Sequence, residues 1–429
     1  MVALRQRRSL CLAVVLIATA GGLAGCSEKK AGAGTPSSAG SASASSPAAS
    51  DTPTPSATAA PSSAALKLSP DTGASSVAPR APITASITDG HLTTVTLTND
   101  QGKAVAGALD ATASTWTASE ALGYNHTYTM TANGEGKDGR SLSQTSTFST
   151  VKPANMTKVY LNTTGGKSLT NGATYGVGIV VVAHFDEAIG DRKAAESALQ
   201  VTTTPAVAGS WYWTDNQNAH WRPENYFAAG TVVTVNANIY GVQVGSGLFG
   251  QEDEALSFKI GEKHVSIADD KTKHVDVYFN DVLQRSMPTS MGRGGSITVN
   301  GQKISFWTQP GTYTVIGQGN PVLMNSATYG LPVNSKLGYK ENIYWATQIS
   351  TDGVYLHQLN STVWAQGHRN LSHGCLNLNG ANATWFYKTA QIGDVVQVVN
   401  TGGEPLAIWQ NGDWSVPWAT WQAGSALHS

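Results

Sequence analysis

The chain has 429 residues and a formal net charge of −1 at pH 7, and charged residues make up only 13% of it. This length has room for about two to four domains, and the near-neutral charge argues against a nucleic-acid partner. The low charge, together with abundant Gly, Ser, Thr and Ala, is typical of exported β-rich modules.

The first 25 residues have the pattern of an export signal. Basic residues Arg5, Arg7 and Arg8 precede a mostly apolar run at residues 10–20, and small residues follow. This run is shorter than the roughly 20 residues that a transmembrane helix needs. Cys11 lies in the run and is therefore expected to be removed with the signal.

The end of the signal, Leu23-Ala24-Gly25-Cys26, resembles the lipobox of bacterial lipoproteins. In that motif the cysteine becomes the lipidated first residue of the mature chain. The resemblance implies an exported protein that is held by a lipid on Cys26 at the outer face of the cytoplasmic membrane, facing the cell wall. The alternative is an ordinary secretory signal with an incidental cysteine.

Residues 26–65 are almost entirely Ala, Ser, Gly, Pro and Thr, and they contain no aromatic residue. Such a segment buries too little apolar surface to offset the entropy of ordering it. It is predicted to be a disordered tether that holds the following domains away from the membrane. The alternative is a disordered tail without a mechanical role.

Residues 66–151 contain short alternating runs that are separated by turn residues, as in a small antiparallel sandwich. One run at residues 93–98 ends at the turn of residues 99–102. Another, at residues 126–130, is predicted to end near Asn133-Gly134.

Residues 152–261 form a second block of strands. Strands are predicted at residues 177–183, 210–213 and 231–239, and one short helix at residues 192–199. His184, Asp186 and Glu187 lie close together in the sequence. One histidine beside carboxylates is interpreted as a surface cluster, and no metal site is predicted there.

Residues 262–401 form a third block, which is again mostly strand. Alternation at residues 274–279 leads into the turn Asn280-Asp281, and Asn300-Gly301 lies between two runs, which is a strong hairpin signal. The remaining predictions are hairpin strands at residues 296–299 and 303–307, strands at residues 312–316 and 395–399, and a helix at residues 381–390.

The last block, residues 402–429, is rich in tryptophan. Trp409, Trp414, Trp418 and Trp421 lie within a short stretch and are interpreted as packing anchors rather than as a ligand platform. The block is predicted to dock on a neighbouring domain.

Loss of Cys11 and lipidation of Cys26 would leave Cys375 without an intramolecular partner. A lone thiol in an exported protein indicates an intermolecular disulfide or a reactive nucleophile. The reactive species is the thiolate, and a free cysteine has a pKa near 8.5, so a neighbouring base is needed. His357 and His373 are the two leading candidates.

The spacing alone does not choose between these histidines. His373 precedes Cys375 by two residues, which puts both side chains on one face of an extended segment. His357 ends a strand-like run eighteen residues before the cysteine, and the intervening chain can loop back beside the thiol. His368 lies inside that loop and is expected to be solvated.

Gly374 permits a positive φ, which would let consecutive N–H groups converge on an oxyanion. The alternative is a turn glycine beside a buried cysteine that acts as a small hydrophobe.

The motif Ser372-His373-Gly374-Cys375-Leu376-Asn377, preceded by His357, resembles the signature of L,D-transpeptidases with a YkuD-type catalytic domain. The resemblance to actinobacterial, mycobacterial-type members extends through His184-Phe185-Asp186-Glu187, Trp221-Arg222-Pro223-Glu224, Ser286-Met287-Pro288-Thr289-Ser290-Met291-Gly292, Ala327-Thr328-Tyr329-Gly330, Trp345-Ala346-Thr347-Gln348-Ile349-Ser350 and Gly412-Asp413-Trp414.

This resemblance implies a mainly β architecture. Two immunoglobulin-like β-sandwich domains, at residues 66–151 and 152–261, would precede a YkuD-type β-sandwich catalytic domain at residues 262–401. The C-terminal extension, residues 402–429, would pack back on the second of them.

The resemblance also implies roles in catalysis. Cys375 would be the nucleophile and His357 the base, with the backbone carbonyl of Gln358 orienting the imidazole. Backbone N–H groups around His373, Gly374 and Cys375 would form the oxyanion site.

Five further residues are placed at the substrate by the same resemblance. Met324, Tyr329 and Tyr339 would line the groove, while Ser372 and Asn377 would shape the loop beside it rather than react.

The implied reaction is acyl transfer between peptidoglycan stem peptides. The thiolate would attack the third residue of a tetrapeptide donor stem, release the terminal D-alanine and form a thioester. The side-chain amine of an acceptor stem would then resolve it into a 3→3 cross-link. Carbapenem-type β-lactams would acylate the same sulfur, and no metal or organic cofactor is expected.

Two other functions stay open at this point: an L,D-carboxypeptidase that uses water as the acceptor, and an inactive tethered cell-wall-binding protein. The sequence also departs from the pattern. Gln358 replaces the usual serine, residues 294–311 form a longer segment, and Ser361 stands where a tryptophan is usual, with Trp364 displaced beyond it. These departures concern the shape of the groove and the choice of acceptor.

Overall fold

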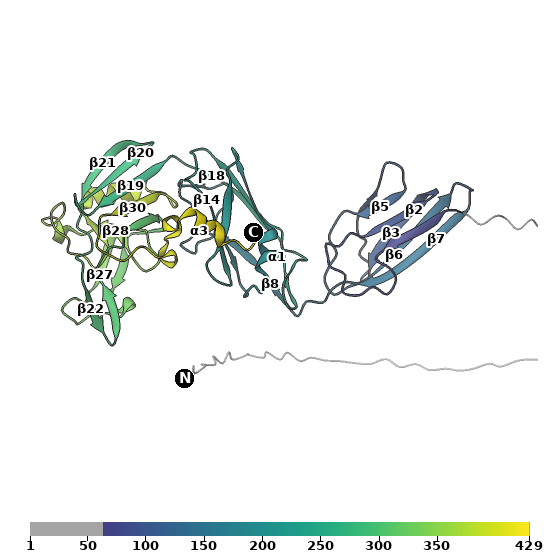
Figure 1. Cartoon of the computed structure of the whole chain (residues 1–429), viewed down its shortest axis with the longest axis horizontal. Helices are drawn as coiled ribbons and strands as arrows, with labels where there is room; N and C mark the ends of the chain where they lie inside the picture. Colours follow the sequence, from purple (N-terminus) through teal and green to yellow (C-terminus); the bar gives the residue numbers. More distant parts are fainter. Residues whose placement is uncertain (1–62, 429) are drawn as a thin grey trace, which may run out of the picture. The chain divides into compact units, whose positions relative to one another are not determined.

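The computed structural model describes residues 63–428. The predicted signal, Cys11, Cys26 and the tether as far as residue 62 lie outside the described residues. Strands dominate the described part (Figure 1), as predicted. None of the helices within residues 63–428 is long and apolar enough to cross a membrane.

The first sandwich is built from two sheets, with strand orders β1-β2-β5-β4 and β3-β6-β7. The side chains of Leu68, Trp116, Met130 and Phe148 are buried in its core. Its strands are β1 (Ala65–Ser69), β2 (Thr84–Thr88), β3 (Gly90–Asn99), β4 (Gly107–Leu109), β5 (Thr115–Ala118), β6 (Thr127–Gly136) and β7 (Ser141–Ser149).

The predicted turn at Asn133-Gly134 is wrong, because β6 continues through both residues. Gly134 pairs with Leu92 and Asn133 with Thr94, so Thr93 forms a bulge in the opposite strand. A Cβ on Gly134 would lie 2.7 Å from the Ile87 side chain. Gly134 therefore lies where the Ile87 side chain approaches the backbone closely within the sheet, and it does not mark the end of the strand.

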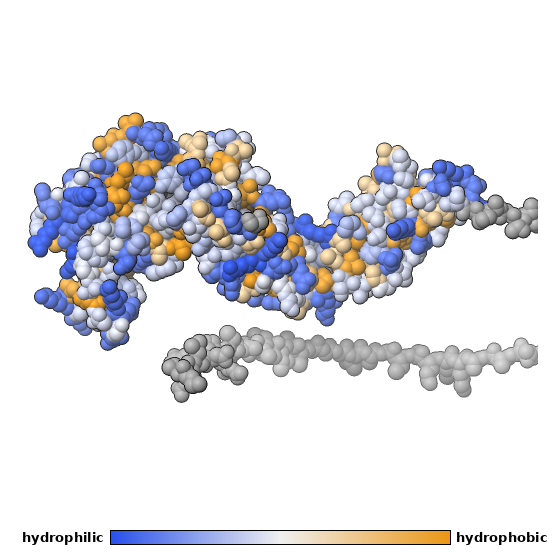
Figure 2. All heavy atoms as spheres, in the orientation of Figure 1, coloured by the Kyte–Doolittle hydropathy of each residue, from blue (hydrophilic) through white to orange (hydrophobic). Residues whose placement is uncertain are grey.

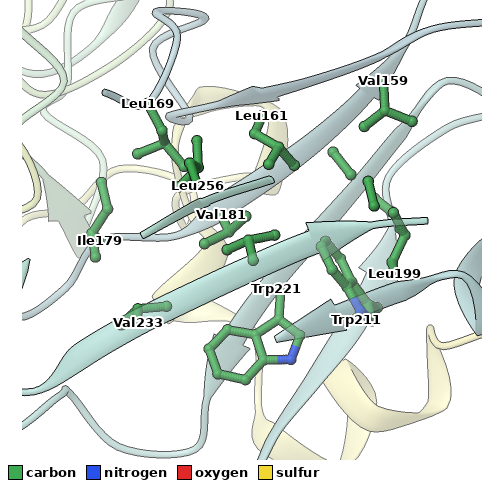
Figure 3. Close-up of a cluster of buried hydrophobic side chains, with 14 of the residues drawn as sticks. Val159, Leu161, Leu169, Ile179, Val181, Leu199, Trp211, Trp221, Val233 and Leu256 are labelled. Carbon is green, nitrogen blue, oxygen red and sulfur yellow. The ribbon is translucent and has the colours of Figure 1, made fainter. Parts of the chain in front are cut away.

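The second sandwich contains sheets ordered β10-β18-β15-β12 and β13-β14-β11-β9, and a smaller sheet β16-β17-β8. Figure 3 shows part of its core, where Leu161, Val181 and Trp221 come from different strands. The elements are β8 (Asn155–Thr157), β9 (Val159–Asn162), β10 (Thr174–Tyr175), β11 (Val181–Phe185), α1 (Arg192–Ser197), β12 (Leu199–Thr204), β13 (Gly209–Trp213), β14 (Asn218–Pro223), β15 (Val232–Ala237), β16 (Gln243–Gly245), β17 (Leu248–Gly250) and β18 (Glu254–Ile260).

Helix α1 confirms the predicted short helix. It begins after Asp191, whose carboxylate accepts a hydrogen bond of 2.9 Å from the N–H of Ala194.

The apolar run at residues 177–183 is only partly a strand, since β11 begins at Val181. Just before it, the N–H groups of Gly176 and Gly178 donate to the carbonyls of Ile392 and Gly393, over 2.8 and 2.9 Å. The glycine backbone of this part therefore contacts the third block, while the side chains of Val177 and Ile179 lie in the core of the second sandwich. The apolar character of the run indicates burial rather than strand pairing.

The third block has two sheets and a separate hairpin. The first sheet is ordered β21-β20-β19-β30-β24, and the second is ordered β25-β27-β28-β29, with β26 paired to β27. Its strands are β19 (His264–Asp269), β20 (His274–Phe279), β21 (Val282–Pro288), β22 (Ser296–Val299), β23 (Gln302–Ser305), β24 (Gly311–Thr314), β25 (Gly317–Gly319), β26 (Val322–Asn325), β27 (Lys340–Gln348), β28 (Tyr355–Gln358), β29 (Leu376–Leu378) and β30 (Val395–Val399). Its helical elements are η1 (Ser326–Tyr329), η2 (Asn360–Thr362) and α2 (Gly380–Thr389).

The hairpin β22–β23 confirms the Asn300-Gly301 turn. Both residues have a positive φ, of 49° and 80°, as a two-residue hairpin turn requires. The hairpin has a small core of its own, in which Ile304 and Phe306 pack with Leu331 from the segment between η1 and β27. It therefore braces the chain segment that follows η1.

The C-terminal extension docks on the second sandwich through Arg222. This arginine is 2% exposed, and its guanidinium lies 4.7, 5.4 and 4.4 Å from the ring centres of Trp414, Trp418 and Trp421. Figure 1 shows the last helix, in yellow, against this sandwich. The helical elements are η3 (Ile408–Gln410), η4 (Asp413–Ser415) and α3 (Trp418–Ala423). The predicted docking is confirmed for these three tryptophans.

Trp409 does not follow the prediction. Its side chain is 66% exposed, so it is not a packing anchor. Figure 2 shows small hydrophobic areas among hydrophilic ones over the visible face of the molecule. The predicted domain limits at residues 151, 261 and 401 stay predictions. Most residues of each main hydrophobic core come from one block, but the core of the second sandwich also contains Val395 of β30.

Candidate active site

The predicted site residues meet where two neighbouring strands run parallel. β28 carries His357, and β29 begins directly after Cys375. His357 pairs with Asn377 in the register of these strands. The chain between them therefore loops back to bring the histidine to the cysteine, as the spacing allowed.

Ser372 shapes the loop that presents the thiol. Its hydroxyl donates to the carbonyl of Cys375 over 2.6 Å and accepts from the N–H of Gly374 over 3.1 Å. Its backbone is fixed to a neighbouring segment, because its N–H donates to Met291 and its carbonyl accepts from Arg293. Ser372 is thus positioned to hold the loop, as expected.

Gly374 is required by its backbone conformation. Its φ is 145°, within the region that side chains rarely adopt, and its carbonyl accepts a hydrogen bond of 2.7 Å from the hydroxyl of Thr308. Thr308 is 1% exposed, so this bond fixes the loop from the protein interior.

The hydrogen bonds of this loop change the predicted oxyanion site. The N–H of Gly374 is already engaged by Ser372, so it is not free to stabilise an oxyanion. Within residues 63–428, the backbone N–H groups of His373 and Cys375 donate to no other group. The available pair of donors therefore flanks the glycine instead of including it.

His357 has the features of a neutral base. It is 3% exposed, and its Nδ1 lies 3.0 Å from the carbonyl oxygen of Gln358. A carbonyl only accepts, so Nδ1 carries the proton and Nε2 keeps a lone pair. Burial lowers the pKa of His357 to about 4, and the imidazole is neutral at pH 7.

Cys375 is half-buried, and its Sγ lies 3.5 Å from the carbonyl oxygen of Gly353. Burial, with a smaller contribution from the Asp352 carboxylate, raises the pKa of its thiol to about 11. At neutral pH the thiol therefore keeps its proton. Burial thus favours the neutral form of both groups, a thiol on Cys375 and a neutral imidazole on His357.

Two cavities meet at Cys375. The first, of about 250 Å³, contains His357 and Met324 in its lining, and the second, of about 390 Å³, contains Tyr329. Tyr339, together with His373 and Cys375, borders both cavities. The three residues predicted to line the groove are thus brought to the thiol, on two different sides of it.

His373 has an aromatic environment. Its ring centre lies 5.0 Å from that of Phe306 and 5.2 Å from that of Tyr339. Burial, together with the nearby guanidinium of Arg293, lowers the pKa of His373 to about 4. Its Nε2 has no hydrogen-bond partner among the described side chains and backbone.

Asn377 is 2% exposed and borders the first cavity, while its backbone forms hydrogen bonds of 3.0 and 3.2 Å with Ser290. Like Ser372, it holds the strand end in place.

The His184 cluster has separate partners. The imidazole of His184 pairs with Asn218 over 2.8 Å, while Asp186 accepts from Thr157 and from the N–H of Lys158 over 2.9 Å each. Residues 63–428 contain no group of His, Cys, Asp and Glu side chains arranged to hold a metal ion.

Sequence reasoning missed three residues that line the second cavity: Trp307, Asp352 and Trp409. Asp352 comes just before the strand that carries His357, but nothing in the sequence relates it to Trp409, which lies 57 positions further along the chain. Only the fold brings these segments together.

Two family models match the chain. One, described as "L,D-transpeptidase catalytic domain", matches residues 263–398, and the other, described as "Bacterial Ig domain", matches residues 74–243. The chain is similar to L,D-transpeptidase 2 of Mycobacterium tuberculosis, with 43% identity over 84% of this chain and 85% of that protein. It is 34% identical to L,D-transpeptidase 5 of the same species, over 84% of this chain and 77% of that one.

Among solved structures, the chain is similar to that of the L,D-transpeptidase LdtMt1 in complex with imipenem. The identity is 28% and the TM-score 0.46, over 56% of this chain and 99% of that one.

Proposed function

Because this chain belongs to the L,D-transpeptidases with a YkuD catalytic domain that follows an immunoglobulin-like part, we propose that it forms 3→3 peptidoglycan cross-links through a thioester on Cys375. One observation carries this proposal. The half-buried thiol lies between two cavities, and one of them also contains the buried, neutral imidazole of His357.

Acylation begins when Sγ of Cys375 attacks the carbonyl carbon of the third residue in a donor tetrapeptide. Nε2 of His357 takes the thiol proton, since the thiol does not ionise by itself at pH 7. The N–H groups of His373 and Cys375 stabilise the tetrahedral oxyanion, at about 3 kcal/mol for each donor. The bond to D-alanine then breaks, and His357 returns the proton to the leaving amine.

Deacylation reverses this sequence with a new amine. The side-chain amine of an acceptor stem attacks the thioester carbonyl, and His357 accepts its proton. The C–S bond breaks, and the thiol is re-formed with that proton. Carbapenems would acylate the same sulfur through the carbonyl of their strained ring.

The test is to incubate the purified protein with a disaccharide-tetrapeptide and follow the products by mass spectrometry. We expect a dimer whose mass corresponds to two substrates minus one D-alanine. Tripeptide without dimer would identify the L,D-carboxypeptidase instead. An unchanged substrate would contradict both activities.

We also propose that Cys26 carries a lipid that anchors the protein to the outer face of the cytoplasmic membrane. The support is the sequence Leu23-Ala24-Gly25-Cys26 and the Ala/Ser/Pro/Thr-rich segment after it. We predict that Cys26→Ala moves the protein from the membrane fraction to the soluble exported fraction, while the control Cys11→Ala leaves it on the membrane. Equal membrane retention of both variants would contradict the lipid anchor.

A further inference from the structure

The second cavity has a wall made by two distant segments. Trp409 comes from the C-terminal extension, and Asp352 comes from the turn just before β28. The hydroxyl of Thr351 donates to the Trp409 carbonyl over 2.6 Å, and Nε2 of Gln410 donates to the Asp352 carboxylate over 2.6 Å. These bonds join the extension to the turn beside the thiol.

Hydrogen bonds fix the backbone of this wall, although the ring of Trp409 is exposed. Gln410 and Asn411 are 6% and 4% exposed, and the Asn411 amide donates to the carbonyls of Thr314 and Ile349 over 2.8 and 2.7 Å. The backbone of Trp409 is thus fixed from both sides while 66% of its side chain meets solvent. A backbone fixed in this way reduces the entropy that this segment loses when the exposed ring contacts a ligand.

The proposed proton transfers indicate which part of the substrate lies in each cavity. His357 borders the first cavity and is absent from the lining of the second. The leaving amine and the attacking amine both exchange a proton with this imidazole, so both occupy the first cavity. The acyl part of the donor stem must extend from the thioester in another direction, and the second cavity is open to it.

Under the proposed function, a donor stem that is identical to the acceptor stem carries the same side-chain amine on its third residue, and a free amine of this kind is an ammonium at pH 7. A tryptophan face and a carboxylate are the two groups that attract an ammonium most directly. We propose that Trp409 and Asp352 bind the side-chain ammonium of the acyl donor, an inference that rests on the proposed function. The C-terminal extension then contributes to donor specificity as well as to packing.

The lining of this cavity contains one carboxylate, Asp352, and one lysine, Lys303. Asp352 accepts from Gln410 and from the hydroxyl of Ser350, which fixes the carboxylate and leaves acceptor positions for a ligand. The other charged residue of the lining, Lys303, is exposed on β23 and forms no ion pair within residues 63–428. Its long side chain is free to turn into solvent when an ammonium enters.

The test compares two donor tetrapeptides, one with a free side-chain amine and one with that amine acetylated. Release of D-alanine is followed in single turnovers with the enzyme in excess, which reports acylation alone. We expect Trp409→Ala and Asp352→Asn each to slow release from the free-amine donor by about tenfold, with little change for the acetylated donor. Trp364→Ala is the matched control, because Trp364 is also 66% exposed but borders neither cavity.

The outcomes separate the inference from its premise. Equal slowing with both donors would reveal a structural effect and overturn the inference, as would unchanged rates with the free-amine donor. Normal acylation with slower consumption of the acyl-enzyme by added acceptor would place the acceptor in the second cavity instead. If the unsubstituted protein releases no D-alanine from either donor, the proposed function itself fails.

Discussion

Replacing Cys375 with alanine will abolish dimer formation and release of D-alanine. The substitution removes the only atom in the proposed reaction that bonds to the donor, so we expect turnover to fall by at least about 10³-fold. It will also remove the mass adduct that imipenem is expected to form with the protein. Intact-protein mass spectrometry after exposure to donor or imipenem measures both effects.

A matched control separates chemistry from folding. Cys375 is half-buried, and alanine removes a single atom, so the thermal midpoint of Cys375→Ala is expected to stay close to that of the unsubstituted protein. Ser372→Ala keeps the thiol but removes the hydroxyl that bonds to Cys375 and Gly374. It should slow the reaction and retain the adduct. An imipenem adduct that persists in Cys375→Ala would contradict the nucleophile assignment.

The sequence predicted those parts of the fold that have a local cause. Asn300-Gly301 predicted a hairpin because a two-residue turn needs positive φ at both positions, and the structure has it. The helix predicted at residues 381–390 and the strand at 395–399 match α2 and β30 to within one residue. Each of these signals lies within a few residues of the element it specifies.

Two wrong predictions, the long strand from Val177 and the turn at Gly134, have their causes in the tertiary structure. The run that begins at Val177 is apolar because Val177 and Ile179 lie in the core of the second sandwich while Gly178 between them bonds to the third block, and Gly134 lies inside a strand whose partner strand bulges. An apolar residue in the sequence indicates that its side chain is buried, and a glycine in a strand indicates that another group lies close to its backbone. Neither signal identifies the segment that provides the contact.

The candidate site likewise contains some residues that a local motif identifies and others that only the fold brings together. The motif around Cys375 placed the nucleophile, and the resemblance selected His357, whose bond to the Gln358 carbonyl is present. The engagement of the Gly374 N–H depends on the rotamer of Ser372, which a sequence does not specify. Four tryptophans in one stretch give the same packing signal, whichever of them the fold buries, so the sequence does not distinguish the exposed Trp409 from its more buried neighbours.

His357→Gln is expected to slow release of D-alanine by about 10²–10⁴-fold at pH 7, because glutamine cannot take the thiol proton. His368→Gln is the matched control, since this histidine is exposed in the loop between His357 and Cys375 and borders neither cavity. We expect it to retain full activity. Equal loss in the two variants would indicate damage to the loop rather than loss of a base.

The pH profile of His357→Gln distinguishes a base from a structural residue. Burial lowers the pKa of His357 to about 4, so in the unsubstituted protein the imidazole stays deprotonated, and acylation should be nearly level from about pH 5 to 9. Without this base only the thiolate reacts, and the raised pKa of Cys375, about 11, makes the thiolate scarce at pH 7. Its fraction grows about tenfold per pH unit below that value. The variant should therefore regain rate steeply between pH 7 and 10, where the unsubstituted protein does not. A level profile in His357→Gln, or the same recovery in His373→Gln, would remove His357 from the role of base.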